Sequence, residues 1–287
     1  MSLRMHWRWL ILLCLPVLGW AKTTANVVVI DWTHAETLLA LGITPSAVPQ
    51  IADYNAWVKA PQLPCEVADI GLRTQPNLES VSERAPEKIL LSPMYQALLP
   101  RLSEIAPVEV FGLYKEGEVN WHAMENLTKA LATAVGHEAL ALPYIAAAQQ
   151  QMQGLRAQIS SQDIAPLLMV QFMDANHVRV FAKNSLYQTA ADELGLENAW
   201  PKATNAWGFA LVGIDDLIGI KPAQIVVVEP LPFGSEQTIA DNALWQHLVS
   251  QSGNQVWRLP AVWSFGALPS TVRFASELVG ASLRVKE

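Results

Sequence analysis

Short apolar segments rich in β-branched residues alternate with helical segments along most of this 287-residue chain. The segments with the character of buried strands are residues 27–30, 88–91, 108–111, 167–173, 225–228 and 256–259. Strands that are separated by helices usually run parallel, and the helices cover both faces of the sheet. The pattern therefore predicts an α/β fold with mostly parallel sheets.

One long stretch without strand character interrupts this alternation. Residues 121–160 are rich in Ala, Gln, Leu, Met and Glu, and Gly136 and Pro143 divide them into a short and a long predicted helix. We therefore expect an N-terminal α/β lobe at 22–118, a helical linker at 119–162 and a C-terminal α/β lobe at 163–287, with a long rigid helix between them.

The two predicted lobes share a sequence pattern. Leu78-Glu79 is followed by Pro86 and a strand, and Ile214-Asp215 is followed at the same spacing by Pro222 and a strand. The proline ends a helix before the strand begins. Two similar lobes leave a cleft between them, where ligand sites commonly lie.

The first residues have the features of an export signal. Arg4 and Arg8 precede a short apolar run, and Gly19 and Ala21 are the small residues that a signal peptidase recognises. We predict a signal peptide at 1–21, cut after Ala21. A retained membrane anchor and lipidation at Cys14 are the alternatives.

Composition and motifs exclude several functions. The net charge is −7 and no basic cluster occurs, so nucleic acid is not an expected partner. The sequence has no Gly-x-Ser-x-Gly elbow, phosphate loop or dinucleotide fingerprint, and its six histidines are dispersed. We therefore expect no enzyme activity, no cofactor and no metal held by side chains. An exported hydrolase with unrecognised catalytic groups is the alternative.

A candidate ligand site is organised around Arg73, in the turn-rich segment 71–79. Trp57 lies in a predicted loop at 55–64, and Tyr95 lies just beyond a strand end, where parallel sheets bind ligands. An arginine among aromatic rings can hold a polar ligand that has an apolar body. Alternatively, Arg73 caps the next helix or pairs with Glu79.

The second lobe offers a facing wall. Trp207, Trp263 and Phe265 lie in its predicted loops. With Trp57, Arg73 and Tyr95 from the first lobe, they predict the two sides of one interlobe cleft.

Several segments resemble one family, the periplasmic binding proteins for ferric hydroxamate siderophores. They are Leu38-Leu-Ala-Leu-Gly-Ile43, Gly71-Leu-Arg-Thr-Gln-Pro-Asn-Leu-Glu79, Asn184-Ser-Leu186, Asn198-Ala-Trp200, Trp207-Gly208 and Pro260-Ala-Val-Trp263. The resemblance covers nearly the whole chain after the predicted signal peptide. It implies two α/β lobes tied by a helix, a periplasmic location, a ferric siderophore as ligand and an inner-membrane ABC importer as partner. We expect a monomer that binds iron only through the siderophore.

The resemblance also implies roles for particular residues. Arg73 and Tyr95 match an arginine and a tyrosine that hydrogen-bond the hydroxamate oxygens around the iron. The body of the siderophore is then expected to pack on aromatic side chains of both lobes. The full expected ligand-binding set is Trp57, Arg73, Tyr95, Arg179, Ser185, Asn205, Trp207, Trp263 and Phe265.

Three positions depart from the family pattern. Phe209 replaces a serine, Phe265 replaces a tyrosine, and Arg179 replaces a leucine that lines the family's pocket. This predicts a different siderophore backbone or a ligand with extra negative charge. Alternatively, Arg179 points to solvent from an edge strand. The alternative cargoes of the same fold are another iron chelate, cobalamin or haem.

Glu79 and Asp215 are related by the internal repeat. The resemblance implies that acids at these two places contact arginines of the importer's permease. The alternative is that both are acids near helix N-termini, favoured there by the helix dipole.

Overall fold

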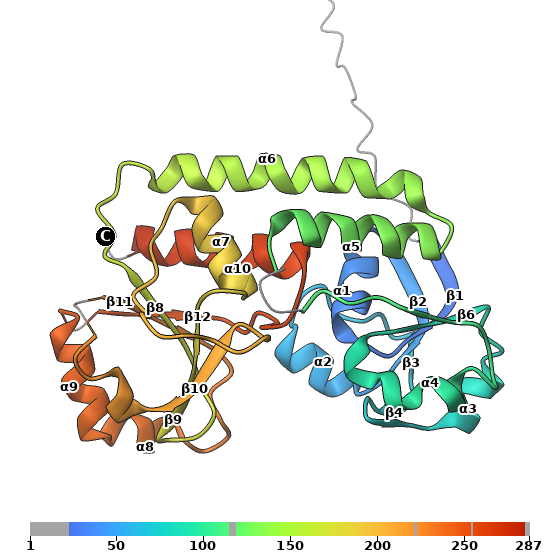
Figure 1. Ribbon diagram of the computed structural model, residues 1–287, viewed down its shortest axis with the longest axis horizontal. Helices are drawn as coiled ribbons and strands as arrows, with labels where there is room; N and C mark the ends of the chain where they lie inside the picture. The colour runs from blue at the N-terminus through green and yellow to red at the C-terminus, as the bar shows by residue number, and fades with distance from the viewer. Residues whose placement is uncertain (1–22, 115–118, 221–222, 254, 285–287) are drawn as a thin grey trace, which may run out of the picture.

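Two five-stranded sheets, each with helices packed against it, lie side by side in the computed structural model (Figure 1). The structure describes residues 23–114, 119–220, 223–253 and 255–284. The predicted signal peptide and Pro222 of the repeat lie outside these residues. The predicted α/β fold class is confirmed, with one qualification for the second sheet given below.

The first lobe contains an entirely parallel sheet in the order β3-β2-β1-β6-β7. Its strands are β1 (Thr23–Val29), β2 (Ile43–Val48), β3 (Ala68–Asp69), β6 (Lys88–Leu91) and β7 (Val108–Val110). Its helices are α1 (Trp32–Ala40), α2 (Ile51–Trp57), α3 (Leu78–Glu83), the 3-10 helix η1 (Pro93–Leu98) and α4 (Leu99–Leu102). Helix α3 begins at Leu78 because the Asn77 side chain accepts hydrogen bonds from the Glu79 and Ser80 amides.

The second lobe repeats this strand order, as β10-β9-β8-β11-β12, but mixes strand directions. Strands β8 (Leu167–Phe172), β11 (Gln224–Val228) and β12 (Val256–Leu259) are parallel. Strands β9 (His177–Phe181) and β10 (Phe209–Gly213) are antiparallel to their neighbours. The helical elements are α7 (Leu186–Leu194), the 3-10 helix η3 (Ile214–Leu217), α8 (Glu236–Asp241), α9 (Ala243–Gln251) and α10 (Leu268–Arg284).

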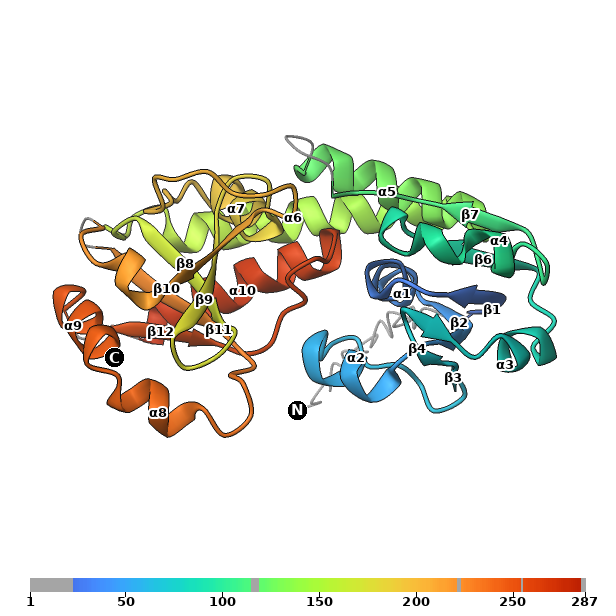
Figure 2. The same cartoon turned by 60° about the horizontal axis from the view of Figure 1, so that its bottom comes forward.

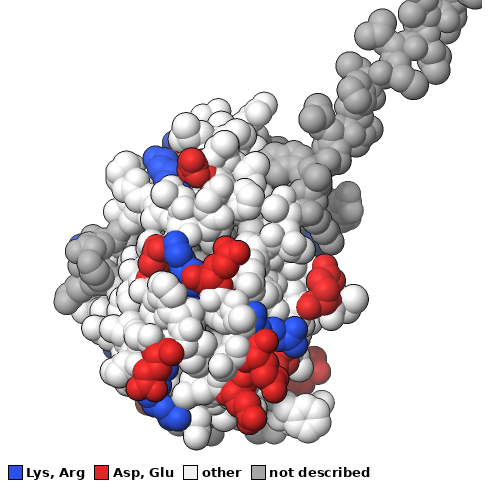
Figure 3. All heavy atoms as spheres, turned by 90° about the vertical axis from the view of Figure 1, so that its right-hand side faces the viewer, with Lys and Arg blue, Asp and Glu red and all other residues white. Residues whose placement is uncertain are grey.

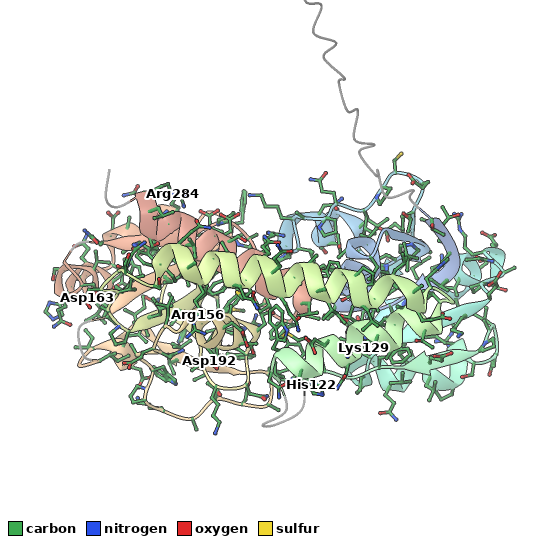
Figure 4. The ribbon with its side chains drawn as sticks, turned by 90° about the horizontal axis from the view of Figure 1, so that it is seen from above. His122, Lys129, Arg156, Asp163, Asp192 and Arg284 are labelled. Atoms are coloured by element: carbon green, nitrogen blue, oxygen red, sulfur yellow. The ribbon has the colours of Figure 1, made fainter. Side chains whose placement is uncertain are left out.

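One long helix, α6 (Ala141–Ile159), lies across both lobes, and Figure 4 shows it from above. The short 3-10 helix η2 (Glu138–Leu140) leads into it. Helix α5 (Trp121–Ala134), which the sequence places in the linker, contacts α1 and so packs on the first lobe. No helix in the described part of the chain is long and apolar enough to span a bilayer.

The lobes share one continuous apolar core and are tied by hydrogen bonds between α1 and residues in and just before α10. The Thr33 hydroxyl donates to the Phe265 carbonyl at 2.7 Å, and the Ser270 hydroxyl reaches both carboxylate oxygens of Glu36 at 2.6 and 2.7 Å. Burial raises the pKa of Glu36 to about 8, partly offset by Ser270 and by the nearby Arg273. The contact between the lobes therefore contains a buried carboxyl group.

The structure differs from the sequence-based expectation in three elements. Trp57 is not in a loop, because α2 extends through it. The strand β10 was missed, although its sequence contains the short apolar run 209–212; it forms the edge of the second sheet. The apolar spacing at 239–249 predicts a single helix, but the segment forms parts of two, because the Asn242 side chain caps a new helix by accepting from the amides of Leu244 and Trp245.

Candidate functional site

A cavity of about 590 Å³ lies between the two lobes. First-lobe side chains lining it are Asp31, Trp32, Thr33, Asp53, Trp57, Arg73, Thr74, Met94, Tyr95 and Tyr114, and second-lobe ones are Met173, Arg179, Trp207, Trp263 and Phe265. Figure 2 shows α2, which carries Trp57, on the side of the first lobe that faces the second. The size and mostly apolar lining suit a compact small molecule.

Arg73 is presented by a tight hairpin. The strands β4 (Gly71–Leu72) and β5 (Gln75–Pro76) pair antiparallel, which leaves Arg73 and Thr74 as the turn. The Gln50 side-chain oxygen accepts from the Arg73 amide at 3.1 Å and from its Nε at 3.3 Å. The Gln50 side-chain nitrogen in turn donates to the Asp53 carboxylate at 2.7 Å. The backbone and the Nε edge of Arg73 are therefore held by Gln50.

The guanidinium of Arg73 lies over an aromatic floor. Its central carbon is 3.5 Å from the ring centre of Trp32 and 5.5 Å from that of Trp263. The Trp32 ring is itself fixed, because its nitrogen donates to the Pro49 carbonyl at 2.9 Å. A cation held over a desolvated ring gains roughly 2 kcal/mol. Among the described residues no acid forms a salt bridge with Arg73, which excludes the alternative of a Glu79 pair.

Tyr95 lies beside Arg73 in η1, just after the carboxyl end of β6. Burial raises the pKa of its hydroxyl to about 12, and the nearby positive charge of Arg73 partly offsets that rise. The phenol is therefore protonated at neutral pH and can donate to a ligand oxygen. Together, Arg73 and Tyr95 form a group of hydrogen-bond donors on the first-lobe wall.

The second-lobe wall is a cluster of aromatic rings. Trp207 stacks on Tyr114 at 5.6 Å between ring centres, and Phe265 meets the edges of Trp207 at 5.6 Å and Trp263 at 5.4 Å. The Tyr114 hydroxyl donates to the Gly266 carbonyl, which joins the two lobes at this point. Such edge and stacked contacts fix the rings before a ligand arrives.

A close backbone approach positions Trp207. Gly208 has a φ of +77°, and a side chain there would collide with the carbonyl of Asn184. Asn184 also donates from its side chain to the Ala206 carbonyl at 2.7 Å. The Asn205 side chain accepts from the amides of Trp207 and Phe209. The loop therefore depends on residues that do not line the cavity.

Arg179 faces the cavity from the middle of β9. It lies between β8 and β10, so it is not on an edge strand. Its guanidinium is 4.9 Å from the ring centre of Phe209 and 5.6 Å from that of Phe265. Loss of hydration lowers the pKa of this group. The alternative of a solvated edge-strand arginine is therefore wrong.

The cavity gathers most of the predicted site residues and leaves out two. The Ser185 hydroxyl caps α7: it accepts from the Gln188 amide at 3.0 Å and donates to the Ala182 carbonyl at 2.7 Å. Asn205 is exposed and shapes the Trp207 loop. Neither lines the cavity.

Sequence reasoning missed several lining residues, above all Trp32 and Tyr114. Asp31 and Trp32 follow the carboxyl end of β1. Parallel sheets bind ligands beyond the carboxyl ends of their strands, so the same reasoning that selected Tyr95 could have selected these two residues. Tyr114 follows β7 at a similar place.

The two predicted docking acids are both exposed. Glu79 lies in the first turn of α3 and Asp215 in the first turn of η3, so the repeat places them at the start of comparable elements. Over the described residues no cluster of three or more His, Cys, Asp or Glu could hold a metal ion.

Two α/β lobes enclosing a cavity with aromatic walls and fixed donors define a substrate-binding protein. The model of the periplasmic binding protein family matches residues 27–262, and the chain belongs to this family. The family resemblance seen in the sequence is thereby confirmed.

The relatives agree with this assignment. The chain is 32% identical over 279 residues to the iron(3+)-hydroxamate-binding protein FhuD of Escherichia coli (strain K12), covering 94% of each. It is 28% identical over 247 residues to the achromobactin-binding periplasmic protein of Dickeya dadantii (strain 3937), covering 80% of this chain and 76% of that one. The crystal structure of Fe³⁺–Desferal-bound FhuD from Vibrio cholerae matches with a TM-score of 0.84 at 30% identity, covering 90% of this chain and 98% of that one.

Proposed function

We propose that this protein captures ferric hydroxamate siderophores in the interlobe cavity and delivers them to an ABC importer of the inner membrane. The observation that carries the proposal is the joint position of Arg73 and Tyr95 beside an aromatic cavity. Hydroxamate oxygens bear negative charge, and a guanidinium and a phenol can donate to them in charge-assisted hydrogen bonds. The relatives named for iron(3+)-hydroxamate binding support this ligand class.

The aromatic walls supply the remaining affinity. The rings of Trp57, Trp207 and Trp263 come from both lobes, so a bound chelate would contact them on opposite sides. Each Å² of apolar chelate surface covered contributes roughly 25 cal/mol. The iron would be satisfied by the siderophore, and no protein side chain would need to coordinate it.

Export and docking complete the proposal. The predicted signal peptide at 1–21 would send the protein to the periplasm, where it would act as a monomer. Glu79 and Asp215 would contact two equivalent sites on the permease, since an acid on each lobe suits a partner with two-fold symmetry. The end of the first lobe shows basic side chains beside acidic ones and no continuous basic area among its described residues (Figure 3).

Quenching of tryptophan fluorescence tests the proposal, because four tryptophans line the cavity: Trp32, Trp57, Trp207 and Trp263. We expect saturable quenching by ferric ferrichrome and ferric ferrioxamine but not by cobalamin or haem. Saturable binding of cobalamin or haem alone would instead support the alternative cargo. Turnover of an ester or glycoside substrate would favour the exported hydrolase.

A further inference from the structure

Arg179 is a half-buried cation whose charge has no partner within the described chain. Its Nε is buried and has no hydrogen-bond acceptor. No salt bridge between described residues includes Arg179. The rings of Phe209 and Phe265 lie against its guanidinium and remove water from it. A cation placed in this way is costly unless an anion joins it.

A second buried donor lies next to Arg179. Gln171 is directly opposite Arg179 in the β8–β9 pair, so the two side chains project from the same face of the sheet. Gln171 is only 1% exposed, and its oxygen accepts from the Ser264 hydroxyl at 3.1 Å. Its nitrogen has no acceptor. Each such unsatisfied buried donor is unfavourable.

The acids of the cavity belong to the opposite wall and are already in use. The Asp31 carboxylate accepts from the Thr33 amide at 2.8 Å, where it caps α1. Asp53 accepts from Gln50, which holds Arg73. Among its described residues, the second-lobe wall thus contributes one cation and no acid to the cavity lining.

The charge of the chelate determines whether a second cation helps. Three singly charged hydroxamates cancel the charge of ferric iron, so a tris-hydroxamate complex is neutral. A carboxylate and an alkoxide from a citrate unit, in place of one hydroxamate, leave the complex with net negative charge. Such a complex would offer carboxylate oxygens, which a planar guanidinium binds with two parallel hydrogen bonds.

We propose that Arg179 forms a second anion-binding position on the second-lobe wall and gives this protein a preference for ferric chelates that combine hydroxamates with carboxylates. The inference rests on the proposed function, because it names the chelate class taken by the same cavity. Arg73 and Tyr95 grip the oxygens around the iron, while Arg179 binds a carboxylate on the other side of the chelate.

Two ferric chelates distinguish this role from general cavity packing. Dissociation constants are measured by tryptophan quenching for ferric ferrichrome, which is neutral, and for the ferric complex of a citrate-based bis-hydroxamate, which is anionic. Arg179→Leu is expected to weaken binding of the anionic chelate about tenfold or more and that of ferrichrome less than about threefold. Arg179→Lys keeps the positive charge but loses the two parallel hydrogen bonds of the guanidinium. Its dissociation constant for the anionic chelate is expected to lie between those of the wild type and Arg179→Leu.

Two controls accompany the variants. Arg258→Leu removes an arginine of β12 that pairs with Glu236 and does not line the cavity, so it should change neither constant. Thermal unfolding without ligand should show Arg179→Leu at least as stable as the wild type, because it removes a desolvated cation.

The outcomes separate this inference from the proposed function. If the wild type binds both chelates and Arg179→Leu changes both constants by the same factor, or neither, the preference does not come from Arg179 and the inference is overturned. If the wild type binds neither chelate, the proposed function itself is wrong.

Discussion

The two lobes have the same strand order but different strand directions, and they contribute different chemistry to the cavity. The five-stranded sheet of the first lobe is entirely parallel, so several of its strands end at one edge and place Trp32, Tyr95 and Tyr114 there. The second lobe has two antiparallel strands, and one of them places Arg179 in the cavity from the middle of a strand. A parallel sheet thus supplies ligand contacts from the loops that follow its strands. An antiparallel pair of strands can also supply a ligand contact from a residue in the middle of a strand.

The comparison predicts that the first lobe contributes the stronger polar contact. Arg73→Ala should weaken binding of ferric hydroxamates about 10- to 150-fold, because a charge-assisted hydrogen bond is lost. The matched control is Arg101→Ala, an exposed arginine of α4 in the same lobe. Calorimetric titration measures both. Equal affinities of Arg73→Ala and the wild type would contradict the proposed function.

The contact between the lobes should make stability depend on pH. Native Glu36 keeps its proton up to a pKa of about 8, whereas the unfolded side chain releases it near 4.5. The native state therefore binds more protons between these values, and the free energy of unfolding should fall as pH rises, by at most about 1.4 kcal/mol per pH unit. Urea unfolding at pH 6, 7 and 8 measures this slope.

Glu36→Gln should reduce that slope, and Glu83→Gln, at an exposed position of α3, should not. Burial lowers the pKa of His34, which contributes a slope of opposite sign, so the difference between wild type and variant isolates Glu36. If the free energy of unfolding changed with pH equally in Glu36→Gln and the wild type, the pH dependence would not come from Glu36.

The aromatic wall of the second lobe should depend on the close approach of Gly208 to Asn184. Gly208→Ala places a Cβ against the Asn184 carbonyl and should destabilise the fold by about 1–3 kcal/mol and weaken ligand binding by displacing Trp207. Gly234→Ala is the matched control, since Gly234 also has a positive φ but its Cβ would meet open space. Equal losses in both variants would mean that only backbone strain matters.

The docking acids should have the smallest effect on affinity. Glu79→Lys combined with Asp215→Lys should leave the dissociation constant within about twofold, since both acids are outside the cavity lining, but should reduce siderophore-dependent uptake in cells. The charge reversal Asp216→Lys, next to Asp215, serves as control. Weaker binding by the double variant in vitro would argue against docking.

Local signals in the sequence predicted the elements that local chemistry controls. Asn77 caps the start of α3 and Gly195 ends α7, and the apolar run predicted as a strand at 88–91 forms β6. The apolar run predicted as a strand at 167–173 likewise forms β8. Strand β10 was missed although it contains a short apolar run, because four apolar residues after a loop do not by themselves show that the segment pairs with β9.

The candidate site was predictable to a similar degree. Arg73 and Tyr95 stood out because a lone arginine in a turn and a tyrosine after a strand are local features, and the structure brings them together at the cavity. Ser185 is outside the cavity lining, because its hydroxyl caps α7, a role that a serine before a helix often has. Trp32 was missed because a tryptophan at a helix start gives no sign that an arginine from another segment will lie on it.

By itself, the sequence determined the α/β class, the division into two lobes and the residue types of a site for a polar ligand with an apolar body. These follow from the order of apolar runs and from side-chain chemistry, which are written along the chain. Only the tertiary structure decided that Gln50 holds Arg73, that Tyr114 stacks on Trp207, and that Arg179 faces the cavity without an acid partner. These contacts join residues far apart in sequence, and their geometry is set by how the two sheets pack together.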